Sequence, residues 1–194
     1  MIASIRTLTV ALAALVVAGV AVAAVPAATG LGAAERVTLL SMREEEKLAH
    51  DVYVALAAET GLSIFTRIAA SETRHEQAVE RALAAYGVAD PADGYAVGAF
   101  PSQRFQELYD ELVAQGSRSV AAALAVGVRI ETLDIADLRA AIEQTDESRL
   151  DRVYASLLAG SRQHLRAFQA ASTGDVAGHP APEASARRGP RWSR

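Results

Sequence analysis

The segment Ser71-Glu72-Thr73-Arg74-His75 contains a glutamate and a histidine three residues apart. On an α-helix, residues at this spacing project from nearly the same face one turn apart, so both side chains can bind one metal ion. The same face carries apolar residues at spacings of three or four, namely Ile68, Val79, Leu83 and Tyr86. An ionised carboxylate on a buried face is unfavourable unless it is paired or bound to a cation. The pattern therefore predicts a helix that directs a Glu-x-x-His pair into the protein core.

The composition of the chain is typical of an all-helical protein. Ala, Leu, Glu and Arg dominate its 194 residues, cysteine is absent, and strand-like alternation of β-branched and polar residues is scarce. Residues 31–171 are enough for one domain with a sizeable core. They carry 14 basic and 21 acidic side chains, a net charge of −7. This charge argues against nucleic acid as a partner and favours metal cations.

The two ends of the chain differ from this central part. In residues 1–30, Arg6 is the only charged residue and residues 8–25 are apolar, which is typical of a secretory signal peptide. An uncleaved membrane anchor is the alternative, because about 18 apolar residues just span a bilayer. Both interpretations predict a secreted or cell-envelope protein, with membrane contact only if the segment is retained. Residues 172–194 are rich in Gly, Pro, Ala and Ser, which predicts a disordered tail.

Apolar periodicity and turn residues predict five helices, which cover residues 35–60, 64–86, 102–114, 119–144 and 146–170. The short link after the first helix makes the first two an antiparallel hairpin. Residues 87–101, rich in Gly and Pro, and the short amphipathic helix after them form one long connection to the next hairpin. Ser119 is the expected N-cap of the helix that follows. The predicted fold is an all-α four-helix bundle whose long crossover contains a short extra helix.

The first helix supplies an inward carboxylate. Its apolar stripe selects Glu46 from the run Glu44-Glu45-Glu46, and Tyr53 lies two turns further along the same face. The other two glutamates are expected to be solvated and to pair with Arg43 and Lys47, as charged runs usually do.

The last two helices supply further inward polar residues. Glu131 and Asp134 lie three residues apart on an apolar face, and His164 lies on the apolar face of the last helix. A single inward histidine is more often a hydrogen-bonded core residue than a metal ligand, but His164 is the second such histidine. His50, four residues after Glu46, is a weaker candidate for the same site.

Four segments resemble the ferritin-like domain-of-unknown-function family 2202. In chain order they are MREEEKLA (42–49), SETRH (71–75), IETLDIADL (130–138) and GSRQHLRAF (160–168). Glu46 with Tyr53, and Glu72 with His75, also resemble the first-helix and second-helix pairs of ferritin and rubrerythrin. The resemblance implies a ferritin-like bundle with a di-iron or di-manganese site between its helices.

The chain departs from ferritin in its last helix. A Glu-x-x-His pair is expected there, but Ser161 occupies the position three before His164, while Asp134 adds a carboxylate to the preceding helix. The ligand set that we predict is Glu46, Glu72, His75, Glu131, Asp134 and His164. Oxygen ligands with two imidazoles and no thiolate favour two iron ions, or manganese, over a structural zinc ion. Tyr53 is the predicted catalytic residue, as a hydrogen-bond donor or radical site.

Three functions are compatible with these residues. The first is an exported oxidoreductase whose metal pair reacts with oxygen or peroxide and oxidises ferrous iron or another small donor. The second is a protein that binds metal without turnover. The third is a metal-free helical interaction scaffold in which the carboxylates and histidines satisfy one another. A small homo-oligomer is expected rather than a storage shell.

Overall fold

The computed structural model of the protein describes residues 30–174, which form five α-helices and no strand. The helices are α1 (Ala33–Thr60), α2 (Ser63–Ala85), α3 (Gln103–Gly116), α4 (Val120–Gln144) and α5 (Ser148–Ser172). The predicted all-α fold is therefore confirmed. Each end of a predicted helix lies within two residues of an observed end.

Two segments for which the sequence makes a prediction lie outside the described residues. They are the N-terminal segment, interpreted as a signal peptide or anchor, and residues 175–194 of the predicted tail. Both interpretations stay predictions. Helix α5 continues to Ser172, where the tail was predicted to begin. Among the helices of residues 30–174, none combines the length and apolar character that crossing a membrane requires.

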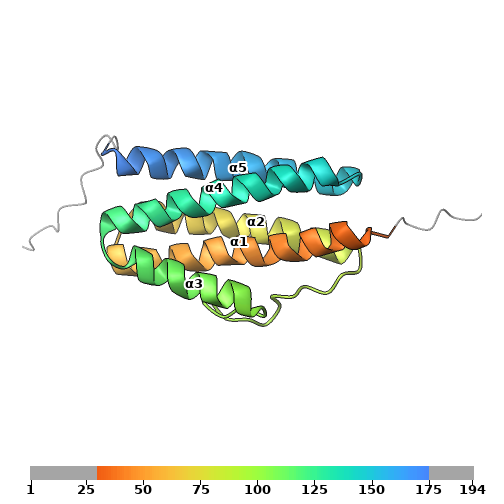
Figure 1. Ribbon diagram of the computed structural model, residues 1–194, viewed down its shortest axis with the longest axis horizontal. Helices are drawn as coiled ribbons and strands as arrows, with labels where there is room; N and C mark the ends of the chain where they lie inside the picture. Colours follow the sequence, from red (N-terminus) through yellow and green to blue (C-terminus); the bar gives the residue numbers. More distant parts are fainter. Residues whose placement is uncertain (1–29, 175–194) are drawn as a thin grey trace, which may run out of the picture. The chain divides into compact units, whose positions relative to one another are not determined.

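The four long helices form two antiparallel hairpins, α1/α2 and α4/α5 (Figure 1). Helix α1 packs against α4, and α2 packs against α5, so the two hairpins close a four-helix bundle. Residues 86–102 lead the chain back along the bundle, and α3 then packs over α1 and α4. Because this long connection returns the chain to the end where α2 begins, α2 and α4 run parallel.

The ends of the helices follow local sequence signals. Gly61 adopts a left-handed conformation with a φ of 67°, and its N–H donates to the carbonyl of Ala57 at 2.9 Å. This ends α1 and permits the tight turn into α2. The hydroxyl of Ser119 accepts a hydrogen bond from the N–H of Ala122 at 3.1 Å, so the predicted N-cap of α4 is confirmed.

The bundle core consists of two apolar layers with a polar level between them. One layer lies toward the turn between α1 and α2 and includes the mutually packed rings of Tyr53, Phe65 and Phe168. The other lies toward the opposite end and includes Leu39, Val79, Leu83, Leu138 and Leu157. On each long helix, the inward polar residues occupy positions between those that contribute to the two layers. Polar groups at this level are therefore shielded from water on both sides.

Arg43 joins the long connection to the first hairpin. It is only 5% exposed, and its guanidinium donates to Glu76 at 2.9 Å, to Glu80 at 3.0 Å and to Asp90 at 2.9 Å. Glu76 and Glu80 belong to α2, and Asp90 belongs to the connection. A guanidinium satisfies several carboxylates at once because it presents five donors in a rigid plane.

Lys47 and Asp51 bind the next part of the connection. The Lys47 ammonium donates to Asp51 at 2.5 Å and to the carbonyl of Ala96 at 2.9 Å, and it lies over the ring of Phe100. The Asp51 carboxylate also accepts a hydrogen bond from the N–H of Gly98 at 2.8 Å. Both charged side chains are buried. Contacts with each other and with the connection therefore compensate these two side chains for the hydration that they lose on burial.

These contacts correct the prediction for the glutamate run. Arg43 and Lys47 do not pair with Glu44 and Glu45, because their partners come from α2, the connection and the next turn of α1. Glu44 and Glu45 are half-buried rather than freely solvated. The Glu45 carboxylate accepts a hydrogen bond from Ser41 at 2.7 Å, and burial raises the pKa of Glu45.

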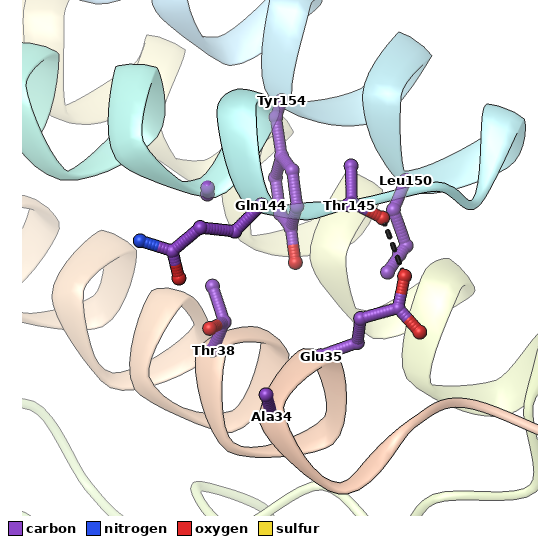
Figure 2. Close-up of a pocket in the computed structure, with 8 residues that line it drawn as sticks. Ala34, Glu35, Thr38, Gln144, Thr145, Leu150 and Tyr154 are labelled. Atoms are coloured by element: carbon purple, nitrogen blue, oxygen red, sulfur yellow. Dashed lines mark hydrogen bonds between the residues drawn. The ribbon is translucent and has the colours of Figure 1, made fainter.

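A small cavity lies where α1 begins and α4 ends (Figure 2). Its volume is about 10 Å³, roughly the size of one water molecule. Figure 2 shows the Tyr154 side chain reaching from α5 toward Thr38 of α1, beside Gln144. The Tyr154 hydroxyl is buried and has no hydrogen-bond partner among the described residues. The cavity is too small for an organic ligand and is separate from the polar level of the core.

We expect Arg43→Met to destabilise the protein by about 1–3 kcal/mol, because it leaves the partly buried carboxylates of Glu76 and Asp90 without their cation. Arg129→Met is the matched control, since Arg129 forms an exposed ion pair with Glu111 at 2.7 Å. That change should cost less than about 1 kcal/mol. Urea unfolding measures both free energies. Equal losses in the two variants would show that Arg43 does not hold the connection.

Candidate metal centre

Five ionisable side chains from all four long helices meet at the polar level of the core. They are Glu46 of α1, Glu72 and His75 of α2, Glu131 of α4 and His164 of α5. Each of the three glutamates is only 2% exposed. The inward direction that helical periodicity predicted for these residues is thus observed, and packing of the two hairpins brings them together.

Glu72 lies at the centre of this group. Its Oε2 atom lies 2.7 Å from Nδ1 of His75, and its Oε1 atom lies 2.8 Å from Nδ1 of His164. The two imidazole rings stack with their centroids 5.4 Å apart. Each carboxylate oxygen of Glu72 therefore faces a different imidazole.

The other glutamates complete two groups of three around Glu72. In the first, Glu46 Oε2 lies 3.2 Å from Nδ1 of His75. In the second, Glu131 Oε1 lies 3.5 Å from Nδ1 of His164. Within each group, one oxygen or nitrogen atom from every residue lies within 4.8 Å of the others. Two cations held by these groups would share Glu72 as a common ligand.

The close contacts of Glu72 are not ordinary hydrogen bonds. Nδ1 of His164 is buried and has no aligned hydrogen-bond partner among the described residues, although Glu72 Oε1 is only 2.8 Å away. Glu46 Oε1 is also buried and unpartnered. Buried polar atoms almost always have partners. Glu72 and His164 approach closely without hydrogen-bond alignment. This arrangement is expected of two side chains that bind the same cation.

The charges of the cluster depend strongly on one another. Burial and the neighbouring charge of Glu72 raise the pKa of Glu46 and of Glu131 to about 7. Burial opposes ionisation of Glu72, but the imidazoles of His164 and His75 outweigh it and lower its pKa to about 2. Burial also disfavours imidazolium, yet the carboxylates raise the pKa of His75 to about 10 and of His164 to about 9. A carboxylate between two imidazoles is thereby stabilised in its charged form.

Tyr53 connects this cluster to the aromatic layer. Its hydroxyl donates to Glu131 Oε1 at 2.7 Å, and its fully buried ring packs against Phe65 and Phe168. Burial and the negative charges of Glu131 and Glu72 raise the pKa of Tyr53 well above its ordinary value. The phenol therefore stays a proton donor to Glu131 and fixes the orientation of that carboxylate.

Asp134 lies near the cluster but belongs to neither group of three. Burial and the negative charge of Glu46 raise the pKa of Asp134 well above its ordinary value, so the two carboxylates are close enough to repel. Ser161 occupies the facing position on α5, and its hydroxyl donates to the carbonyl of Leu157 at 3.0 Å. The structure thus places Asp134 beside the five clustered residues.

His50 lies outside the cluster. Its Nδ1 atom is 2.8 Å from Asp51 Oδ1 and 3.7 Å from Glu76 Oε1. The hydrogen bond to Asp51 raises the pKa of His50, although burial opposes this shift. His50 therefore belongs to the charged network that holds the long connection.

Gly160 is a site residue that the sequence analysis missed. A Cβ atom on Gly160 of α5 would lie 2.5 Å from Nε2 of His75 on α2. The absence of a side chain lets the two helices approach while Nδ1 of His75 faces Glu46 and Glu72. The position of Gly160 one turn before His164 places it on the inward face of α5, which was the only indication in the sequence. Its contact with His75 joins two helices, and no sequence pattern predicts such a contact.

Comparisons with known proteins show the family and the fold of this chain. The family described as "Uncharacterized protein domain (DUF2202)" matches residues 35–175. The chain is 47% identical over 134 residues to "Uncharacterized protein MJ0754" of Methanocaldococcus jannaschii, a match that covers 69% of this chain and 72% of that protein. The crystal structure of this hypothetical protein superposes with a TM-score of 0.73 at 43% identity, covering 75% of this chain and 83% of the other.

We expect Gly160→Ala to destabilise the protein by about 1–3 kcal/mol, because the added methyl group overlaps the His75 ring. In a His75→Ala background the overlap is gone. The same change should then stabilise the protein by roughly 0.5–1 kcal/mol, the usual gain for alanine over glycine inside a helix. Urea unfolding of the four proteins gives the coupling. Stabilisation in both backgrounds would contradict the contact.

Proposed function

The chain belongs to the DUF2202 family, and we propose that it is a ferritin-like di-metal carboxylate protein that holds two iron or manganese ions between its four long helices. The observation that carries this proposal is the sharing of Glu72 by two groups of metal-ligand side chains. The unpartnered Nδ1 of His164 supports it further. Oxygen and imidazole ligands without thiolate suit iron and manganese.

The residues of the cluster have distinct roles in this proposal. Glu72 would bridge the two ions, and His75 and His164 would each supply one nitrogen ligand. Glu46 and Glu131 would be the remaining carboxylate ligands, one on each side. Two divalent ions would also offset the mutual repulsion of the buried carboxylates, which is large in an environment without water.

We further propose an oxidoreductase activity. Iron ions bound there would supply oxidation chemistry with oxygen or peroxide, directed at ferrous iron or another small donor. The apolar layers on both sides exclude water from the reacting level. Tyr53 would hold its proton at the hydroxyl, orient Glu131 through their 2.7 Å hydrogen bond and serve as an oxidisable side chain beside the cluster.

Asp134 is the sixth ligand that we propose, in place of the glutamate expected on the last helix. Its closeness to Glu46 and its position opposite Ser161 support this role.

A metal-free scaffold is the second candidate function. It is favoured by the mutual stabilisation of charge between Glu72 and the two imidazoles, which compensates part of the burial cost without a cation. A protein that binds metal without turnover would use the same ligands as the oxidoreductase. Export from the cytoplasm and assembly into a small homo-oligomer also remain part of the proposal.

Elemental analysis is the direct test of the metal centre. Protein purified without chelator, or reconstituted anaerobically, should contain about two iron or manganese ions per chain, and Glu72→Ala/His75→Ala should contain none. His50→Ala is the matched control, because His50 lies outside the cluster, and it should keep both ions. Absence of metal from the unaltered protein would favour the scaffold.

The role of Asp134 can be tested by moving the carboxylate back to α5. We expect Asp134→Ala to weaken binding of at least one ion by about tenfold or more. Adding Ser161→Glu to this variant creates a Glu-x-x-His pair and should restore affinity. Metal titration with a competing chelator measures both effects. Two equivalents bound by Asp134→Ala at full affinity would exclude Asp134 as a ligand.

Oxidant consumption separates catalysis from binding alone. Protein loaded anaerobically with ferrous iron should consume oxygen or peroxide faster than the same concentration of free iron, because the cluster holds both ions beside Tyr53. An oxygen electrode and stopped-flow absorbance follow the reaction. A rate no higher than that of free iron, with two ions bound, would leave a metal-binding protein without turnover.

A further inference from the structure

A groove with a volume of about 390 Å³ lies on the outer face of the α4/α5 hairpin. Its floor contains Ile135 and Leu165, and three arginines flank it: Arg139 from α4, and Arg162 and Arg166 from α5. All three arginines are exposed, and none forms an ion pair within the part of the chain that the structure describes. The groove therefore combines an apolar floor with a positively charged rim.

The concentration of positive charge contrasts with the rest of the domain. Residues 31–171 carry a net charge of −7, yet no acidic side chain lines the groove. Helix α5 has no acidic residue after Asp151. Arg162 and Arg166 are also four residues apart on one helix face, where like charges repel. An anion that contacts both guanidinium groups would relieve this repulsion.

The size and lining of the groove indicate the kind of ligand. Its volume lies within the range of about 300–1,000 Å³ for small-molecule sites, well above the size of an inorganic anion. Guanidinium groups bind phosphate and carboxylate oxygens through paired hydrogen bonds. The side chains of Ile135 and Leu165 offer contact to an apolar body. We propose that this groove binds a small organic anion that carries a phosphate or carboxylate group on an apolar body.

The groove is separate from the candidate metal centre but close to it in the chain. Ile135 follows Asp134, and Leu165 follows His164, so the two sites lie on opposite sides of the wall formed by α4 and α5. The ligand makes its contacts on the outer side of this wall. Its binding does not depend on bound metal.

Calorimetric titration with 1-naphthyl phosphate tests the proposal, with 1-naphthol and inorganic phosphate as probes that each lack one half of the ligand. We expect saturable binding of 1-naphthyl phosphate and much weaker binding of the other two. Arg162→Gln/Arg166→Gln should weaken this binding about tenfold or more, through loss of charge-assisted hydrogen bonds. Arg149→Gln/Arg152→Gln removes two exposed charges from the same helix outside the groove and should leave it nearly unchanged.

Two further measurements make the outcome decisive. Circular dichroism and urea unfolding verify that both double variants stay folded. The titration is repeated with Glu72→Ala/His75→Ala, in which unchanged affinity shows that the groove is independent of the metal centre. Absence of saturable binding to the unaltered protein would overturn the proposal. An equal loss in both arginine variants would do the same, since it indicates attraction to the overall charge of α5.

Discussion

The structure depends on one constraint: three glutamates and two histidines are buried at the same level of a four-helix bundle. Burying charge is costly unless opposite charges lie close by. Here one oxygen of Glu72 lies 2.7 Å from Nδ1 of His75 on the same helix, and the other lies 2.8 Å from Nδ1 of His164 on α5. The apolar layers above and below hold this level in place. Burial raises the free energy of these charged groups, and it also strengthens their electrostatic attraction for a cation.

A second set of buried charges fixes the part of the chain that is not helical. Arg43 and Lys47 project from α1 and hold residues 90–98 through carboxylates and backbone groups. Arg43 also bonds to Glu76, which follows His75 directly. The long connection, α1 and the metal-ligand turn of α2 are thus joined by one network. The network therefore stabilises the first hairpin through contacts that do not involve α4 or α5.

The α4/α5 hairpin carries two functions in our interpretation. Its inner face supplies Glu131 and His164 to the candidate metal centre, while its outer face carries the arginine-lined groove. The two faces use different positions of the same helices, because adjacent residues on a helix point in different directions while residues three or four apart share a face. A core rich in carboxylates and imidazoles and a positively charged outer surface therefore lie back to back.

The sequence by itself determined the helices and which face of each is buried, because both follow from local periodicity. That sufficed to name five residues that meet at the core. Only the tertiary structure decided what crosses between helices. The partners of Arg43 lie 33 to 47 residues away, Gly160 faces His75 from another helix, and Asp134 stops short of the cluster. These contacts depend on how closely the helices pack, and the spacing of residues along one helix carries no information about that distance.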